Sequence, residues 1–138
     1  MHPIIRNTLA VVIGIIVGSI VNMQVINFGM SSVPLPEGVD PMNAIDWDLI
    51  HFATPFMAHA LGTFAGAAVA SFIAASYKKS FALIIGAVFL AGGITMVFII
   101  PAPVWFITLD LVVAYLPMGW LGWCFATGIS SFFSSRQN

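Results

Sequence analysis

The stretch "HFATPFMAHALGTFAGAAVASFIAASY", residues 51–77, contains no Asp, Glu, Lys or Arg and is long enough to cross a lipid bilayer as a helix. Three other apolar runs have a comparable length. The four runs extend from Ile4 to Phe28, Ile50 to Ala75, Phe81 to Ile100 and Val104 to Phe125. Because their apolar residues are continuous rather than alternating, they predict transmembrane helices and not the strands of a barrel.

The composition agrees with this fold class. Hydrophobic residues make up 60% of the 138 residues and charged residues only 7%, whereas soluble domains carry about 25% charge. So few charges cannot cover a water-exposed surface, so we expect the bilayer to be the solvent. We therefore predict an all-α integral membrane protein with a single domain, residues 1–138. Its four helices form an antiparallel bundle, with one outer loop at residues 29–49.

The charges predict an orientation. All basic residues fall on one side of the four spans, at Arg6, Lys78, Lys79 and Arg136. The loop between the first two spans holds only acidic charges, at Glu37, Asp40, Asp46 and Asp48. The positive-inside rule then places both termini in the cytoplasm. Within this loop, Asp40-Pro41 is typical of an N-cap and first position of a short helix leading to the second span.

Small residues predict where the helices approach one another. The first span carries Gly14 and Gly18, and the second carries Gly62 and Gly66, each pair at four-residue spacing. Such stripes let two helix backbones come close in lipid. Packing inside the bundle is the simplest use of them. Contact between copies of the chain in a homo-oligomer is the alternative.

Each span also carries a polar side chain at a similar depth. With a rise of 1.5 Å per residue, His59 lies about 13 Å and Asp110 about 10 Å below the outer boundary. Asn22 and Thr95 lie about 9 Å and about 8 Å below it. Four unrelated polar residues would not be expected to align in this way. We infer a polar layer in the outer half of the bundle.

Asp110 is the only acidic residue inside a predicted span, and an aspartate at mid-membrane costs about 2.5–3.5 kcal/mol on insertion scales. His59 is the one titratable partner at its depth, so we predict that the two side chains meet. Asn22, Thr63 and Thr95 are the expected further members of this site. If a metal ion binds, His59 and Asp110 are its predicted ligands. The alternative is a structural clamp that fixes helix register through interhelical hydrogen bonds.

Other residues near this layer receive plainer interpretations. His51 is expected at the water interface, where it would be solvated. Pro55 and Pro117 are expected to kink the second and fourth helices. Tyr115 is interpreted as a packing residue or an interface anchor.

Three segments carry a family resemblance: "NTLAVVIGIIVGSIVNM" in the first span, "FMAHALGTFAGA" in the second and "APVWFITLDLVVAYLPMGWLG" in the fourth. With them the chain resembles a family of small uncharacterised bacterial four-helix inner-membrane proteins. The resemblance covers nearly the whole chain. It implies a location in the bacterial inner membrane, and it implies no activity.

The sequence leaves three classes of function open. No phosphate-binding glycine loop, HExxH or paired-cysteine motif is present, so an enzyme is disfavoured. The net charge of −1 gives no electrostatic footprint for nucleic acid, so a nucleic-acid partner is not expected. No cofactor is indicated, and a quinone-linked role has no specific support. A protein that binds or transports a small solute, proton or metal ion at the polar layer is favoured. The alternative is a structural or accessory subunit of a larger membrane complex. A cavity reaching His59 and Asp110 would favour binding, and a dry contact would favour the clamp.

Overall fold

The computed structural model describes residues 2–136, in which the regular secondary structure is helical and no strand occurs. The elements in chain order are α1 (Pro3–Ser32), η1 (Ala44–Asp46), η2 (Leu49–Phe52), α2 (Ala53–Ile73), α3 (Lys78–Ile99), α4 (Val104–Val113) and α5 (Leu116–Ser135). Four stretches are long and apolar enough to cross a membrane: Pro3–Ser32, Leu49–Ile73, Lys78–Ile99 and Val104–Ser135. The predicted helical fold class and the four membrane-length helices are therefore confirmed.

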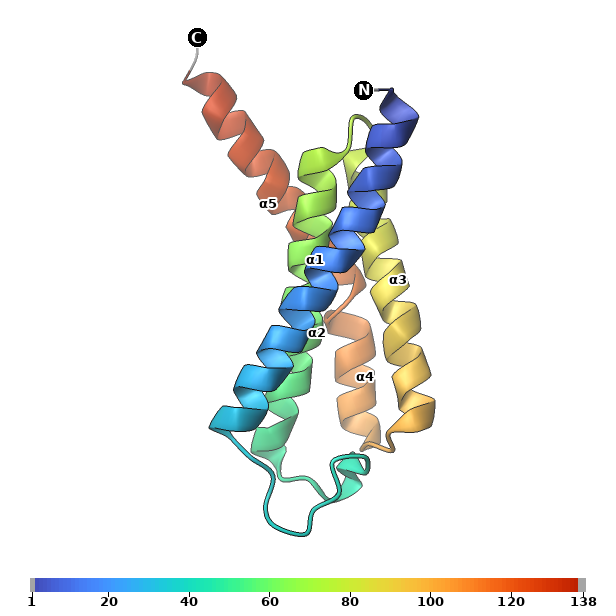
Figure 1. The fold of residues 1–138 in the computed structure, drawn as a ribbon, viewed down its shortest axis with the longest axis vertical. Coiled ribbons are helices and arrows are strands. Elements are labelled where there is room, and N and C mark those ends of the chain that lie inside the picture. Colours follow the sequence, from blue (N-terminus) through green and yellow to red (C-terminus); the bar gives the residue numbers. More distant parts are fainter. Residues whose placement is uncertain (1, 137–138) are drawn as a thin grey trace.

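The helices run up and down beside one another (Figure 1). The start of α1, the α2–α3 turn and the end of α5 lie at one end of the bundle, which we call the terminus end. The α1–α2 connection lies at the other, the loop end. At the terminus end, Arg6 Nε donates to the Ile73 carbonyl and Asn7 Nδ2 donates to Ser76 Oγ. These contacts tie the start of α1 to the end of α2.

The four predicted packing glycines lie at the contact between α1 and α2. A Cβ built on Gly14 would lie 2.8 Å from the Gly66 carbonyl oxygen, and one built on Gly18 would lie 2.7 Å from that of Gly62. The reverse distances are equally short, 2.6 Å from Gly66 to the Gly14 oxygen and 2.8 Å from Gly62 to the Gly18 oxygen. The two backbones thus pack where any side chain larger than a hydrogen would separate them. The stripes serve packing within the chain.

The fourth apolar run differs from the prediction of one kinked helix. α4 ends at Val113, and α5 begins at Leu116 and extends to Ser135, ten residues beyond the predicted end at Phe125. Pro117 is the second residue of α5. It has no N–H for the Val113 carbonyl, and its ring would clash with that carbonyl in a continuous helix. The helix breaks for this reason.

Two further expectations about the helices need correction. Pro55 does not kink α2, because α2 begins at Ala53 and is unbroken to Ile73. Pro55 therefore sits in the first turn, where backbone N–H groups have no partner within the helix in any case. The first helix also continues to Ser32, beyond the predicted end at Phe28.

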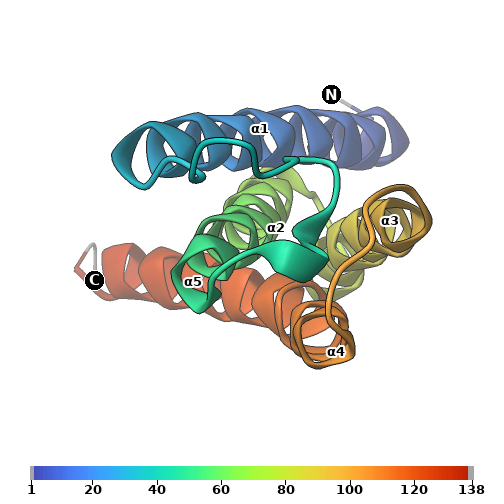
Figure 2. The same cartoon turned by 90° about the horizontal axis from the view of Figure 1, so that it is seen from below.

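The α1–α2 connection crosses the loop end of the bundle, as the view along the axis shows (Figure 2). Asp40 Oδ1 accepts from the Met42 N–H at 2.8 Å, so Asp40 caps a turn and not the predicted helix. The first helical turn, η1, begins later, and its N-cap is Asn43. The Ala44 N–H then donates to the Pro101 carbonyl at 2.8 Å, which fastens the connection to the α3–α4 turn.

His51 is buried, contrary to the expectation of a solvated side chain. Its Nε2 lies 3.2 Å from the Pro34 carbonyl oxygen, at the beginning of the connection that leads to η1. The α1–α2 connection folds back over the helix ends, and this excludes water from the ring.

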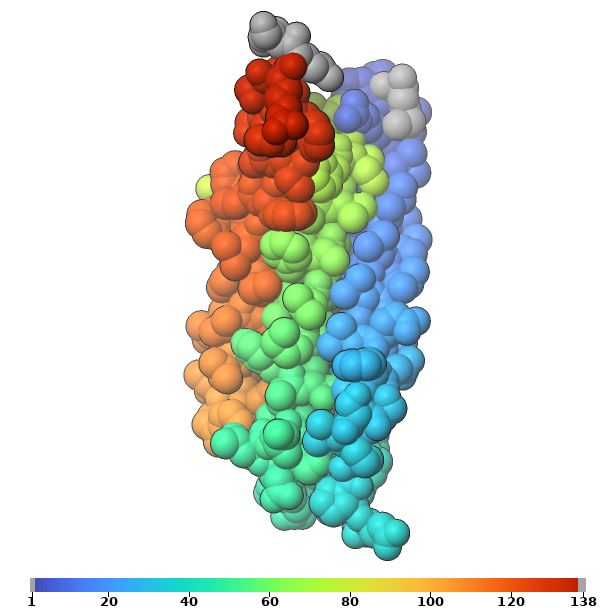
Figure 3. All heavy atoms as spheres, turned by 90° about the vertical axis from the view of Figure 1, so that its left-hand side faces the viewer, coloured from blue at the N-terminus to red at the C-terminus, as the bar shows by residue number. Residues whose placement is uncertain are grey.

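α5 separates from the bundle towards its C-terminal end (Figure 1). A space-filling view from the side shows α2 lying between α1 and the α4–α5 helices (Figure 3). Gly122 makes the close approach to α2, since a Cβ built there would lie 2.6 Å from the Phe64 carbonyl oxygen. Beyond it, residues 131–136 are exposed.

Candidate functional site

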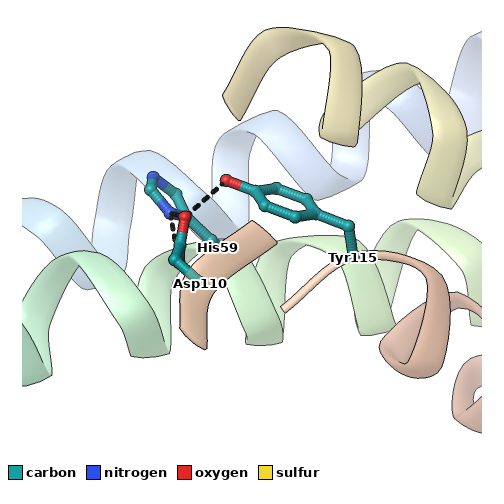
Figure 4. A network of polar contacts seen from close by, with 3 residues as sticks. All are labelled: His59, Asp110 and Tyr115. Carbon is teal, nitrogen blue, oxygen red and sulfur yellow. Dashed lines mark hydrogen bonds and ion pairs between the residues drawn. The ribbon is translucent and has the colours of Figure 1, made fainter. Parts of the chain in front are cut away.

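His59 and Asp110 meet between α2 and α4. Nδ1 of His59 lies 2.9 Å from each carboxylate oxygen of Asp110 (Figure 4). The predicted contact between the two side chains is therefore present. The Asp110 side chain is 7% exposed and that of His59 is 23% exposed, so the carboxyl group is buried while the imidazole retains an open side.

Tyr115 completes this cluster, which we call the polar triad: His59, Asp110 and Tyr115. The Tyr115 hydroxyl donates to Asp110 Oδ2 at 2.9 Å, and its ring stacks on the His59 imidazole with centroids 5.7 Å apart. Tyr115 is 2% exposed. Tyr115 packs in a buried cluster with Ala60 and Ala114, as the packing interpretation expected, but that interpretation did not include the hydrogen bond to Asp110.

The helix break explains why Tyr115 can reach Asp110. In a continuous helix, residues five apart point about 140° away from each other and could not share a hydrogen bond. Because the chain leaves the α-helical path at Tyr115 (φ −117°, ψ −82°), its ring turns back along α4. Gly93 on α3 makes room for it, since a Cβ there would collide with the hydroxyl. Pro117, two residues after Tyr115, was the sequence signal that could have indicated this arrangement.

A cavity of about 400 Å³ opens beside the triad on the loop-end half of the bundle. Its volume lies within the roughly 300–1,000 Å³ range of ligand pockets. Its walls come from all four membrane-length stretches and from the α1–α2 connection. The lining residues that matter here are Asn22, Met96, Val97, Trp47, His59 and Asp110. The other residues that line it are apolar, so His59, Asp110 and Asn22, together with the indole of Trp47, supply its polar groups.

The remaining sequence-predicted members lie apart from the cavity. Thr63 is fully buried one turn from His59, and its Oγ1 has no hydrogen-bond partner among residues 2–136. Thr95 is exposed, and its hydroxyl donates to the Ala91 carbonyl of its own helix. It lies about 200° around α3 from Gly93, the residue that faces the triad. Depth along the helix predicted Thr95 for the site, but the side chain points to another side of α3.

The side chains of this site are better suited to hydrogen bonding than to binding a metal ion. Among residues 2–136 no three His, Cys, Asp or Glu side chains are close enough to hold a metal ion. His59 Nδ1 is already engaged by Asp110. The other ring nitrogen, Nε2, points away from both partners (Figure 4) and has no hydrogen-bond partner in the described part of the chain. It is therefore the free polar group of the triad.

Comparisons of the chain with protein-family models, with curated proteins and with solved structures find no match.

Proposed function

We propose that this chain is a multi-pass protein of the bacterial inner membrane, with both termini in the cytoplasm and the loop end facing outward. Four membrane-length helices support the insertion. The segregation of charge supports the orientation, because Arg6, Lys78 and Lys79 lie at the terminus end while the acidic residues lie in the α1–α2 connection. The resemblance to small bacterial inner-membrane proteins agrees with this location.

Within this frame, we propose that the protein binds a small molecule in its outer half. The observation that carries the proposal is the cavity of about 400 Å³ that ends on His59. A hydrogen-bonded clamp needs no such space beside it, whereas a ligand pocket combines apolar walls with a few placed polar groups. An ionisable pair within a membrane-length helix is also a functional hypothesis by default.

Binding is better supported than conduction of an ion or a solute. The acidic side chains of the loop do not line the cavity, so no charged path leads a cation to His59. On the terminus side, fully buried Ala67, Ala70, Ala82 and Ile85 form a packed cluster. A conducting path would have to cross this cluster. The site therefore suits a ligand that enters and leaves by the same opening.

The proposed binding is tested with naphthalene, an apolar probe small enough for a compact pocket. Thermal unfolding of the purified protein in detergent is measured over a range of naphthalene concentrations, since a ligand that binds only the folded state raises the unfolding temperature. Val97→Phe fills the cavity, and Val88→Phe, an exposed position on the same helix, is the matched control. We expect stabilisation of the wild type and Val88→Phe but not of Val97→Phe. Equal responses from all three proteins would refute a specific pocket.

The orientation has a separate test by cysteine labelling of intact cells with a membrane-impermeant maleimide. In a Cys124→Ser background, Glu37→Cys should be labelled from outside, and Lys79→Cys only after the cells are lysed. The opposite pattern would overturn the proposed orientation and leave the binding proposal in place.

The accessory-subunit alternative has one observation in its favour. The end of α5 projects from the bundle, and Phe132 and Phe133 there are exposed. In that case the polar triad would act as a clamp within the chain. Asp110→Asn separates the two functions. If Asp110 serves binding, the variant keeps its fold and its place in the membrane but binds ligand less well. Unfolding or loss from the membrane would support the clamp.

A further inference from the structure

The cavity is covered at the loop end. Pro41, Ala44 and Trp47 of the α1–α2 connection line it there, and the hydrogen bond from Ala44 to the Pro101 carbonyl holds the connection in place. Ala44 also packs with Phe52 and Phe106 in a buried apolar cluster. A water-soluble ligand arriving along the bundle axis would have to displace this cluster.

The side of the cavity lies between α1 and α3, because Asn22 and Ile26 of α1 and Met96 and Val97 of α3 all line it. These helices touch near Gly14 and Gly18, where built Cβ atoms would meet Ile85 and Phe89, and they diverge towards the loop end (Figure 1). In the diverging region Met96 lines the cavity yet is 41% exposed. If the four helices span a bilayer, this side faces the acyl chains. The opening is therefore directed to lipid.

The charge balance of the triad bears on whether the free Nε2 of His59 carries a hydrogen. An imidazolium beside a carboxylate has no net charge, and neither has a neutral imidazole beside a protonated carboxyl group that donates to Nδ1. In both arrangements the hydrogen lies on Nε2. A neutral imidazole beside a carboxylate would place a net negative charge away from water, which is costly within a membrane. In both uncharged arrangements the free Nε2 is an N–H donor.

From these observations we propose that the ligand is a neutral, lipid-soluble carbonyl compound that enters from the outer leaflet between α1 and α3. Its carbonyl oxygen accepts the hydrogen bond from His59 Nε2, and its apolar body fills the cavity. This inference rests on the proposed binding function. A bare anion is disfavoured because Asp110 already balances the imidazole, and a cation is disfavoured because Nε2–H offers no lone pair.

The test compares naphthoquinone with naphthalene, which has the same two fused rings but no carbonyl group. Dissociation constants come from the concentration dependence of thermal stabilisation in a Cys124→Ser background, which prevents reaction of the quinone with the thiol. We expect naphthoquinone to bind about tenfold more tightly than naphthalene, the size of one hydrogen bond. In His59→Phe this ratio should fall to about one, whatever the variant's affinity for naphthalene itself. Each probe partitions into the detergent to the same extent for every variant. A change in the ratio of the two dissociation constants between variants therefore reports the hydrogen bond alone.

Two further arms keep the result decisive. If His59→Phe does not fold, histidine nitrogen NMR of the wild type replaces it, and naphthoquinone but not naphthalene should shift the Nε2 signal. A short-chain diacylglycerol tests the ester carbonyl of membrane lipids, and we expect weaker competition from it than from the compact ring. An unchanged ratio in His59→Phe, or an unmoved Nε2 signal, overturns this inference while naphthalene binding still supports a pocket. No binding of either probe overturns the proposed function itself.

Discussion

The contact between α1 and α2 predicts a sharp difference between two glycine-to-alanine substitutions. Gly66→Ala would place its Cβ 2.6 Å from the Gly14 carbonyl oxygen, 3.2 Å from Ile85 Cγ2 and 3.3 Å from Gly18 Cα. Two of these neighbours are backbone atoms of α1, which cannot move without the helix. Gly92→Ala is the matched control, because no described atom lies within 4 Å of a Cβ built on Gly92.

The expected magnitude follows from this geometry. The shortest contact is about 0.8 Å below the 3.4 Å at which ordinary contact begins, so α1 must retreat by a comparable distance. Inserting a carbon into a packed contact costs about 1–3 kcal/mol. Alanine also favours a helix over glycine by up to about 1 kcal/mol, but both variants gain this term. The difference between the two free energies of unfolding should therefore be about 1–3 kcal/mol, with Gly66→Ala the less stable.

The assay is reversible unfolding in mixed micelles, followed by tryptophan fluorescence as the denaturing detergent is increased. Gly66 does not line the cavity, so naphthalene binding to the folded variant should be retained. A Gly66→Ala protein as stable as Gly92→Ala, within a few tenths of a kcal/mol, would refute the close α1–α2 contact.

Three further predictions use the same unfolding assay. Tyr115→Phe should lower the free energy of unfolding by about 0.6–1.7 kcal/mol, the range for interhelical hydrogen bonds in membranes. Tyr77→Phe is the control and should not change it, because Tyr77 is exposed. Equal effects of the two substitutions would mean that the Tyr115 hydroxyl does not bond Asp110. Thr63→Val should be neutral or stabilising, because Oγ1 is buried without a partner among residues 2–136. A loss of unfolding free energy above about 1 kcal/mol would mean that the hydroxyl is bonded. Pro117→Ala should let α4 and α5 join into one helix, so Tyr115→Phe added to this variant should not lower the free energy of unfolding further. If Tyr115→Phe lowers it as much as in the wild type, the proline does not cause the helix break.

Part of the site could be predicted from the position of residues along each helix. Depth along a helix depends only on the number of residues from its end, so the level shared by Asn22, His59 and Asp110 could be computed. Thr95 shared that level but not the direction, because the rotation of a helix about its axis is set by what it packs against. On α3, Gly93 faces the triad because only glycine leaves room for the Tyr115 hydroxyl.

By itself the sequence determined the number of membrane-length helices, their up-and-down order, the glycines that serve packing and the pairing of His59 with Asp110. Each depends on local apolarity, on helical periodicity or on the cost of a lone charge in lipid, which are properties of a segment or of a pair. The tertiary structure alone decided that Tyr115 joins the pair and that a cavity lies beside it. Both depend on the break before Pro117 and on the divergence of α1 from α3. A hydrogen bond across a broken helix and a space left between two helices arise only when all the helices are packed together.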